Sequence, residues 1–439
     1  MSITLFGLVW LIIIAIAFFF GKTKNMIALT FLSMVFQASS VIVISETGVG
    51  PQLITSSLMI VWSFTRYRSF ANVNYKTQQT KFERASRMCV LLLILAIIVS
   101  YLKNSKLYTI NSSVYWLLFI QLLIYVGCFL CCFNVGKSVS ATDIRKIIIG
   151  TITFVSIVGL VQFLLTVNIL PKNSFIELLL YTKDTDSAYY WYDYYPRVFS
   201  TFMEPSYCGA FLVGGFYYII SINKNNNYEK ILSVVVLSEI ILTRSSTAYG
   251  SFVICGAIYL VICKNKKALR YLIPLGIIAV ITLLITGQLK VLLDEVIFNK
   301  MQTGSGHTRN EWDKNALNSF YSSFLFGTGY KNVRGSQFLL SLLGQLGFIG
   351  CIIWFLTWLP MIIFSLKKRN NLNLVASGLF LVGVVVAMFI AIPDIDFCVF
   401  WGAMYMFAIV ISSTVRFKYK ENTVNKKPEQ SSILRISEI

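Results

Sequence analysis

Two arginines and a glutamate are the charged residues best placed to do chemistry, because each stands at the edge of a long apolar segment. Arg197 and Glu204 belong to "RVFSTFMEPSYCG", and the residues after it are almost wholly apolar. Arg244 lies in "ILTRSSTAYGSF", a gap of a few residues between two apolar runs. A charge so close to hydrocarbon is costly, and it marks a functional site by default. Arginine suits a phosphate ligand, because its guanidinium group binds phosphate bidentately and stays charged.

A third arginine, Arg309, belongs to a polar stretch further along the chain. If it converges with Arg197 and Arg244, the three guanidinium groups would bind a polyanion such as the diphosphate of a lipid carrier. They would also stabilise the charge on a departing diphosphate. Simpler interpretations stay open for two of them: Arg244 could extend to lipid phosphates, and Arg309 could pair with Asp313, four positions on.

Glu204 has two competing interpretations. Partial desolvation where a loop enters a membrane span could raise its pKa and make it a proton acceptor. It could instead begin a helix at Pro205, since proline is favoured in the first helical turn, or form an ion pair with Arg197 or Arg244. Glu239 would lie one turn deeper as a partner for a polar group on a neighbouring helix. His307, the only histidine, is either a displaced base or a solvated loop residue.

Metal chemistry finds little support in the sequence. The nearest acidic pair is Asp394 and Asp396 in "PDID", for which a solvated turn is the simpler interpretation. The cysteines form no matched CxxC pairs, and we interpret them as small apolar fillers. We therefore expect no metal and no cofactor.

The elements that must position these residues are membrane spans. Of the 439 residues, 56% are hydrophobic and only 13% are charged, whereas soluble domains carry about 25% charged residues. Apolar runs of spanning length recur from end to end. We predict an all-α polytopic membrane protein with about 12–13 transmembrane helices. The predicted spans are residues 3–20, 26–46, 49–64, 88–102, 114–133, 147–170, 206–222, 231–243, 248–263, 271–287, 337–365, 372–392 and 397–415.

The net charge of +19 orients the chain rather than indicating nucleic acid. Most of the Lys and Arg residues fall in alternate connections and in the C-terminal tail, which marks that side as cytoplasmic by the positive-inside rule. The N-terminus is then outside, and the basic side favours anionic lipid headgroups.

Two outer connections are much longer than the others, and long loops concentrate function. The prediction divides the chain into an N-terminal bundle (1–170), an outer loop (171–205), central helices (206–287), a second outer loop (288–336), C-terminal helices (337–415) and a basic cytoplasmic tail (416–439). The first loop carries the aromatic stretch "YYWYDYY", which is either an interfacial aromatic belt or a platform for sugar rings. Its candidate substrate-binding residues are Trp191, Tyr192 and Tyr195.

The second long loop carries "HTRNEWDKNALNSFYSSFLFGTGYKNVRGS". Thr308 and Glu311 form a capping-box pattern, and apolar residues recur every four positions after it, which predicts an amphipathic helix at the outer membrane boundary. Gly327 and Gly329 would end this helix. Lys331 and Arg334 follow as candidate substrate-binding residues.

Three of these stretches, in their order, resemble the O-antigen ligase/polymerase superfamily of bacterial envelope glycosyltransferases: "RVFSTFMEPSYCGAFLV", "ILTRSSTAYGSF" and "TRNEWDKNALNSF…FGTG…SQFLLSLLGQLGFIG". The resemblance covers residues 190–360 in motif detail. It implies a GT-C-like membrane fold in the bacterial inner membrane, with the active face in the periplasm. It also implies an undecaprenyl-diphosphate-linked glycan as donor.

Within this superfamily the chain is most similar to the polymerases of oligosaccharide repeat units. Arg197 and Arg244 match family arginines. In the ligase branch a histidine precedes a GxxG frame; here the frame is present at Gly347 and Gly350, but Ser336 stands in place of the histidine. We therefore expect an O-antigen polymerase that releases undecaprenyl diphosphate without a metal, with Glu204, Arg197, Arg244 and Arg309 as catalytic residues. A ligase, or a flippase or other transporter of the same lipid-linked units, is the alternative, and a chain-length regulator and a flippase are the expected partners.

Overall fold

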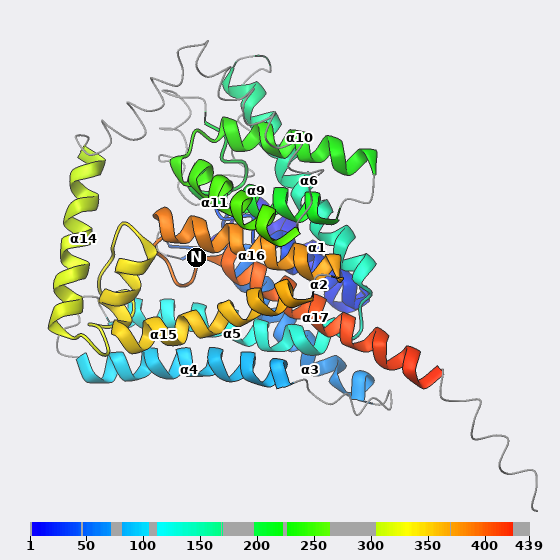
Figure 1. The fold of residues 1–439 in the computed structure, drawn as a ribbon, viewed down its shortest axis with the longest axis horizontal. Coiled ribbons are helices and arrows are strands. Elements are labelled where there is room, and N and C mark those ends of the chain that lie inside the picture. Colours follow the sequence, from blue (N-terminus) through cyan, green and yellow to red (C-terminus); the bar gives the residue numbers. More distant parts are fainter. Residues whose placement is uncertain are drawn as a thin grey trace, which may run out of the picture.

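The computed structural model describes residues 2–44, 47–71, 81–104, 112–167, 169, 197–222, 226–263, 304–368 and 370–424. This part of the chain forms thirteen helices and one small sheet (Figure 1). The helices are α1 (Leu5–Phe20), α2 (Thr23–Ser33), α3 (Pro51–Ala71), α4 (Lys81–Asn104), α5 (Ser112–Gly136), α6 (Ala141–Thr166), α9 (Pro205–Ile222), α10 (Asn227–Leu242), α11 (Ser246–Cys263), α14 (Gly304–Ser322), α15 (Phe338–Lys367), α16 (Leu372–Ala391) and α17 (Cys398–Val424). The predicted span 271–287 and the aromatic residues Trp191, Tyr192 and Tyr195 lie outside the described residues.

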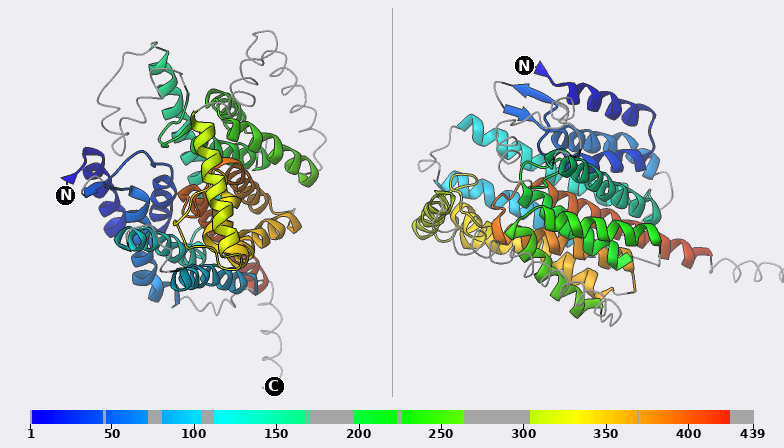
Figure 2. Two further views of the ribbon diagram at one scale, coloured as in Figure 1. Left: turned by 90° about the vertical axis from the view of Figure 1, so that its left-hand side faces the viewer. Right: turned by 90° about the horizontal axis from the view of Figure 1, so that it is seen from above.

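The chain is an all-α polytopic membrane protein. Six helices are long and apolar enough to cross a membrane, namely α4, α5, α6, α9, α15 and α16, and three shorter apolar helices lie within α1, α11 and α17. Most helices run side by side along the long axis of the molecule, whereas α14 lies across one end of them (Figures 1 and 2). This crosswise helix is the one that the pattern after Thr308 predicts, but it begins earlier, at Gly304, and ends at Ser322, before the glycines expected to end it.

The prediction of a continuous second span over residues 26–46 is wrong. Helix α2 ends at Ser33 and has only 11 residues, which corresponds to about 16 Å of helix at 1.5 Å per residue. Beyond Ser33 the chain is mostly non-helical and buried. The backbone N–H groups of Gln37 and Ala38 both donate to the carbonyl of Thr201, at 3.0 and 3.1 Å. Partners from another segment thus replace the helical hydrogen bonds, which is the condition for non-helical backbone inside a membrane protein.

The N-terminal region also contains a small antiparallel sheet. It contains β1 (Ser2–Ile3), β2 (Ile42–Ile44) and β3 (Thr47–Val49), in that order. The side chain of Thr4 caps α1 by accepting from the N–H of Gly7 at 2.8 Å, and it donates to the carbonyl of Ser40 at 2.5 Å. The start of the chain is thereby joined to the end of the α2 region.

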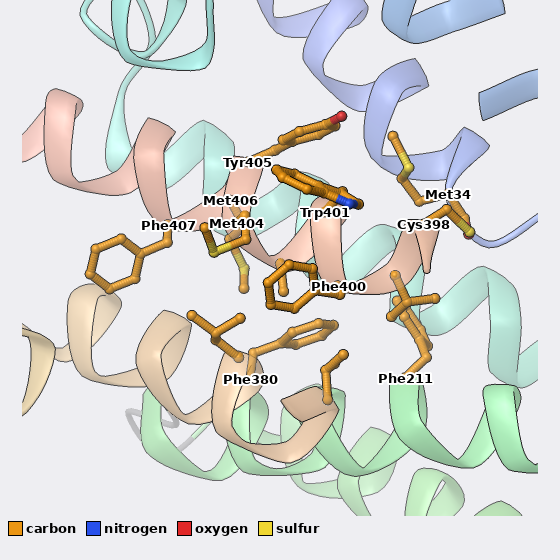
Figure 3. Packing of buried hydrophobic residues seen from close by; sticks show 14 of the residues in the cluster. Met34, Phe211, Phe380, Cys398, Phe400, Trp401, Met404, Tyr405, Met406 and Phe407 are labelled. Carbon is orange, nitrogen blue, oxygen red and sulfur yellow. The ribbon is translucent and has the colours of Figure 1, made fainter. Parts of the chain in front are cut away.

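Helix α17 runs through the middle of the bundle, and its first half is buried on every side. Phe400, Trp401, Met404, Tyr405 and Phe407 are all fully buried. Figure 3 shows Phe400 facing Phe380 of α16, while Trp401 and Tyr405 point the other way, toward α2 and α5. A central helix held on all sides gives a fixed position to the turn that precedes it, residues 392–397.

Helices α9 and α16 approach closely through glycines. A Cβ atom placed on Gly383 would lie 3.0 Å from the backbone of Gly214. Small residues allow this kind of close backbone approach between membrane helices, where packing replaces the hydrophobic effect as the source of association. The close contact holds the start of α9 beside the turn between α16 and α17.

Candidate functional site

Six residues in the described part of the chain have a positive backbone φ angle, and all of them belong to three non-adjacent stretches. They are Ser200 (50°), Arg244 (47°), Gly327 (66°), Lys331 (62°), Gly329 (119°) and Gly347 (65°). Such conformations are costly for residues other than glycine, and they cluster at functional sites. We call the end of the bundle formed by residues 197–204, 243–245, 323–337 and 392–397 the loop end. It is the end that α14 crosses in Figure 1.

Residues 198–202 are buried although they are not helical. The backbone N–H groups of Phe199 and Ser200 both donate to the side-chain oxygen of Gln162, each at 2.9 Å. The hydroxyl of Thr201 donates to the carbonyl of Val35 at 2.7 Å. Glutamine thus satisfies two backbone donors of a loop that enters the bundle, a requirement that a hydropathy profile does not reveal.

Arg197 holds this loop against the end of α10. Its Nε donates to the carbonyl of Thr243 at 3.1 Å, and an Nη donates to the carbonyl of Arg244 at 2.8 Å. Basic side chains commonly bind the free carbonyls at a helix C-terminus in this way. Burial lowers the pKa of Arg197, partly offset by the neighbouring Tyr249 and Glu204. The sequence-predicted partners Arg197 and Arg244 are therefore adjacent, and Arg197 has a structural role that the sequence did not indicate.

Arg244 follows the C-cap residue of α10, Thr243, and its side chain is exposed. Its φ of 47° lies in the left-handed region that closes many helices. The backbone turns here so that α11 can begin at Ser246. Arg244 therefore presents its guanidinium group at the surface of the loop end, beside the more buried Arg197.

Glu204 immediately precedes helix α9, which agrees with its interpretation as a helix start. Its carbonyl accepts from the N–H groups of Tyr207 and Cys208, both at 3.1 Å, and Pro205 is the first helical residue. Its carboxylate is exposed and accepts from the hydroxyl of Ser206 at 3.0 Å. The carboxylate is left at the surface by this helix start, and its other interpretation, as a proton acceptor, stays a prediction.

The glycine frame at Gly347 has a backbone explanation. Gly347 has a φ of 65° and interrupts the helical conformation of α15. A Cβ atom there would lie 2.5 Å from the backbone of Gly327 and Leu325. The break in α15 allows the loop after α14 to form backbone hydrogen bonds with it. The N–H of Thr328 donates to the Gly344 carbonyl at 2.9 Å, and the N–H of Phe348 donates to the Phe324 carbonyl at 2.9 Å. Glycine is needed at Gly347 both for its φ and for contact between two backbones.

Lys331 forms ion pairs with the two aspartates that precede α17. Its Nζ lies 2.7 Å from Asp394 Oδ1 and 2.7 Å from Asp396 Oδ1. Asp396 also accepts from the side chain of Gln121 at 3.2 Å. The side chain of Asp396 is 7% exposed and that of Asp394 is 28% exposed. We call Lys331, Asp394 and Asp396 the lysine–aspartate triad.

The triad corrects two expectations from the sequence. The "PDID" segment is not a solvated turn, because Asp396 is buried and both carboxylates are paired. Lys331 is not a free cation for a substrate anion, because its charge is compensated twice over within the protein. The two carboxylates raise the pKa of Lys331 despite its burial, and Lys331 lowers the pKa of Asp394.

Tyr207 connects the triad to the charges around Glu204. Its hydroxyl donates to Asp394 Oδ2 at 3.5 Å, and Glu204 and Arg334 are also among the charges that act on it. Arg334 is exposed and stacks on the ring of Trp312 in α14, with its guanidinium carbon 4.9 Å from the ring centroid. The loop end therefore places the hydroxyl of Tyr207 against Asp394, within the electrostatic influence of Glu204 and Arg334.

Arg309 does not join the other arginines. It is exposed on α14, and within the described part of the chain it has no ion-pair or hydrogen-bond partner. The expected pairing with Asp313 is wrong, because both carboxylate oxygens of Asp313 accept from Ser336, one from its N–H and one from its hydroxyl, each at 2.7 Å. Ser336, which stands where the ligase branch has histidine, thus ties α14 to the start of α15. His307 is exposed on α14.

Glu239 is fully buried in α10. Its Oε1 would be 2.7 Å from a Cβ atom placed on Gly159, which shows how tightly α6 packs against it. The hydroxyl of Ser156, also on α6, is the polar group that faces its carboxyl group, as the expectation of a partner on a neighbouring helix states. A buried carboxylate without a cation is so costly that the group is expected to carry a proton.

The described residues contain no group of three His, Cys, Asp or Glu side chains that could hold a metal ion, and the eight cysteines whose side chains are described are free thiols. The chemistry available at the loop end is that of three arginines (Arg197, Arg244 and Arg334), a carboxylate at a helix start, and carboxylates held by a lysine.

Comparisons with family models and with curated proteins give no match for this chain.

Proposed function

We propose that the chain is a membrane glycosyltransferase that joins oligosaccharide repeat units carried on undecaprenyl diphosphate, as an O-antigen polymerase does. The observation that carries this proposal is the distribution of unusual backbone. Five of the six described residues with positive φ lie in the motifs that resemble the ligase/polymerase superfamily, and the sixth, Lys331, lies between two parts of the third stretch. These stretches are far apart in the sequence but form one end of the bundle.

The charges at the loop end suit this reaction. The acceptor hydroxyl attacks the anomeric carbon of the donor, and the lipid diphosphate leaves. Because the leaving group is already good, the protein must position both substrates, neutralise the diphosphate and accept one proton. Arg244 and Arg334 are exposed and Arg197 is close to Arg244, so these guanidinium groups are candidates to bind the diphosphate.

The orientation and the location belong to the same proposal. The loop end would face the periplasm and the C-terminal end of α17 the cytoplasm, in the inner membrane of a bacterium. A chain-length regulator and a flippase would act with it.

The purified protein in proteoliposomes tests this function directly. With undecaprenyl-diphosphate-linked repeat units as the sole substrate, we expect products of two or more units and release of undecaprenyl diphosphate. A lack of both products, with substrate that a known polymerase elongates, would contradict the proposal. A strain that lacks the gene distinguishes the alternatives, since loss of a polymerase leaves single units on the lipid core, loss of a ligase leaves none, and loss of a flippase blocks export.

Replacement of the arginines tests the diphosphate contact. Arg244→Lys keeps the charge but removes the bidentate geometry, so we expect the rate to fall at least about tenfold, the factor that corresponds to one lost hydrogen bond of a charged group. Arg309→Lys is the matched control, because Arg309 lies on α14 without a contact to the other two arginines. A normal rate for Arg244→Lys and for Arg334→Lys would remove the arginine argument.

A further inference from the structure

The lysine–aspartate triad contains the only carboxylate of the described loop end that is both held in place and accessible. Asp396 is held but buried, at 7% exposure, and Glu204 is exposed at the start of α9 with the hydroxyl of Ser206 as its hydrogen-bond donor. Asp394 combines the two properties, since its side chain is 28% exposed, Lys331 contacts one of its oxygens, and Tyr207 contacts the other.

The backbone around Asp394 is fixed by the core. The carbonyl of Asp394 accepts from the N–H of Phe397 at 3.2 Å, and the carbonyl of Ile395 accepts from the indole of Trp401 at 3.1 Å. Trp401 is fully buried in the central helix α17. A carboxylate on such a turn keeps its position to the accuracy that proton transfer requires.

The charge of the triad also suits proton uptake. With both aspartates ionised, Lys331 compensates one of the two negative charges, so the triad keeps a net charge of −1. A proton on Asp394 removes this excess and leaves the neutral pair of Lys331 and the buried Asp396. Uptake therefore creates no unpaired charge in the interior, a change that would otherwise be costly.

We propose that Asp394 is the catalytic base of the transfer, that it accepts the proton of the acceptor sugar hydroxyl, and that Lys331 is a positioning residue that holds it ionised. This inference rests on the proposed function and assigns to Asp394 the role that the sequence suggested for Glu204. In the step, the acceptor oxygen forms a bond to the anomeric carbon of the donor, and its proton passes to Asp394. The bond from the anomeric carbon to the diphosphate oxygen breaks, and the electron pair leaves with the diphosphate.

The main test is Asp394→Asn in proteoliposomes that contain lipid-linked repeat units. We expect the rate of elongation to fall about 10²- to 10⁴-fold, the usual contribution of a general base. Retention of the fluorescently labelled lipid-diphosphate donor should stay within about twofold, since the arginines are unchanged. Asp313→Asn, at a carboxylate that only ties α14 to Ser336, is the matched control for a lost aspartate near the same loop.

The role of Lys331 has its own readout. In Lys331→Met, two carboxylates face each other without a cation, so the pKa of Asp394 should rise. The acid limb of the pH–rate profile should then move to higher pH. In Lys331→Met/Asp396→Asn, the negative charge of Asp396 is removed as well, so the acid limb should return toward lower pH. A purely structural role for Lys331 would lower the rate equally at every pH.

Each outcome decides the inference separately from the proposed function. If the unaltered protein forms no polymer from lipid-linked units, the proposed function fails. If it polymerises and Asp394→Asn stays within about tenfold of it while Glu204→Gln loses activity, Asp394 is not the base. Should Asp394→Asn not fold, the pH–rate limb of the Lys331 variants decides: a shift supports the proposal, and an unmoved limb overturns it.

Discussion

At the end of the bundle opposite the loop end, each buried carboxylate has cations of its own, whereas at the loop end two carboxylates share one lysine. Glu83 is paired with Arg87 at 2.8 Å and with Lys137 at 3.7 Å, and Glu229 is paired with Arg145. These residues lie on or beside regular helices. At the loop end, by contrast, Arg244 and Lys331 lie on turns with a positive φ, and Arg244, Arg334 and Glu204 are exposed.

This difference in charge balance shows that acidic and basic residues serve two different purposes at the two ends of the bundle. At the opposite end, cations equal or exceed the buried acids, and the pairs join α4 to the end of α5 and α6 to α10. Such pairs hold helices together and leave no charge unassigned. At the loop end the protein keeps an excess negative charge beside exposed arginines on backbone that is costly to maintain. Strain and uncompensated charge persist where a site needs them.

The largest expected effect comes from removing the shared lysine. Lys331→Met leaves the buried Asp396 without its cation, and we expect a loss of about 3–5 kcal/mol in the free energy of unfolding. Lys137→Met, at the opposite end, should cost less than about 1 kcal/mol, because Lys137 is partly exposed and Glu83 keeps Arg87. Thermal unfolding of both variants in detergent measures the difference. Equal losses would show that the triad is an ordinary ion pair.

Two glycines allow the cost of an added Cβ atom to be compared between the loop end and a regular helix. Gly347→Ala places a Cβ atom against the backbone of Gly327 at a φ of 65°, and we expect a loss of about 2–3 kcal/mol in unfolding free energy. Gly150 is in the interior of α6, where a Cβ atom meets nothing within 4 Å. Gly150→Ala should therefore stabilise the protein by about 0.5–1 kcal/mol. A stable Gly347→Ala variant would mean that the break in α15 is dispensable.

The smallest effect is expected at Glu239. A buried carboxyl group that faces a hydroxyl and no cation is neutral, so Glu239→Gln should change the free energy of unfolding by less than about 1 kcal/mol. Glu229→Gln, at the opposite end, loses an ion pair to a partly exposed arginine, and should cost about 1–2 kcal/mol. Chemical denaturation of both variants at pH 7 ranks them. A larger loss for Glu239→Gln would indicate that Glu239 is ionised.

Hydropathy predicted most of the fold because the membrane imposes the pattern. A span must satisfy its own backbone hydrogen bonds, so long apolar runs become helices regardless of their neighbours. The prediction failed at residues 34–46 because Thr201, far along the chain, accepts hydrogen bonds that a helix would otherwise use. No local pattern reports a partner at that distance.

The candidate site was predictable in part for the same reason. Arg197, Glu204 and Arg244 attract attention as charges beside apolar runs, and the structure places the two arginines together. The lysine–aspartate triad could not be found this way, because Lys331 and Asp394 are 63 positions apart and two helices separate them. In sequence "PDID" looks like any polar turn, and only the packing of α17 shows that Asp396 is buried.

The separation of Lys331 from its aspartates has a consequence for biosynthesis. The ribosome releases Lys331 before α15, α16 and the turn that carries Asp394 and Asp396. Until α16 and the start of α17 have been inserted, the lysine has no carboxylate partner, and the loop that carries it cannot complete its docking. The lysine–aspartate triad is therefore completed only when the turn before α17 is in place. A chain that ends before Asp394 would leave the loop end open even though every earlier helix is in place.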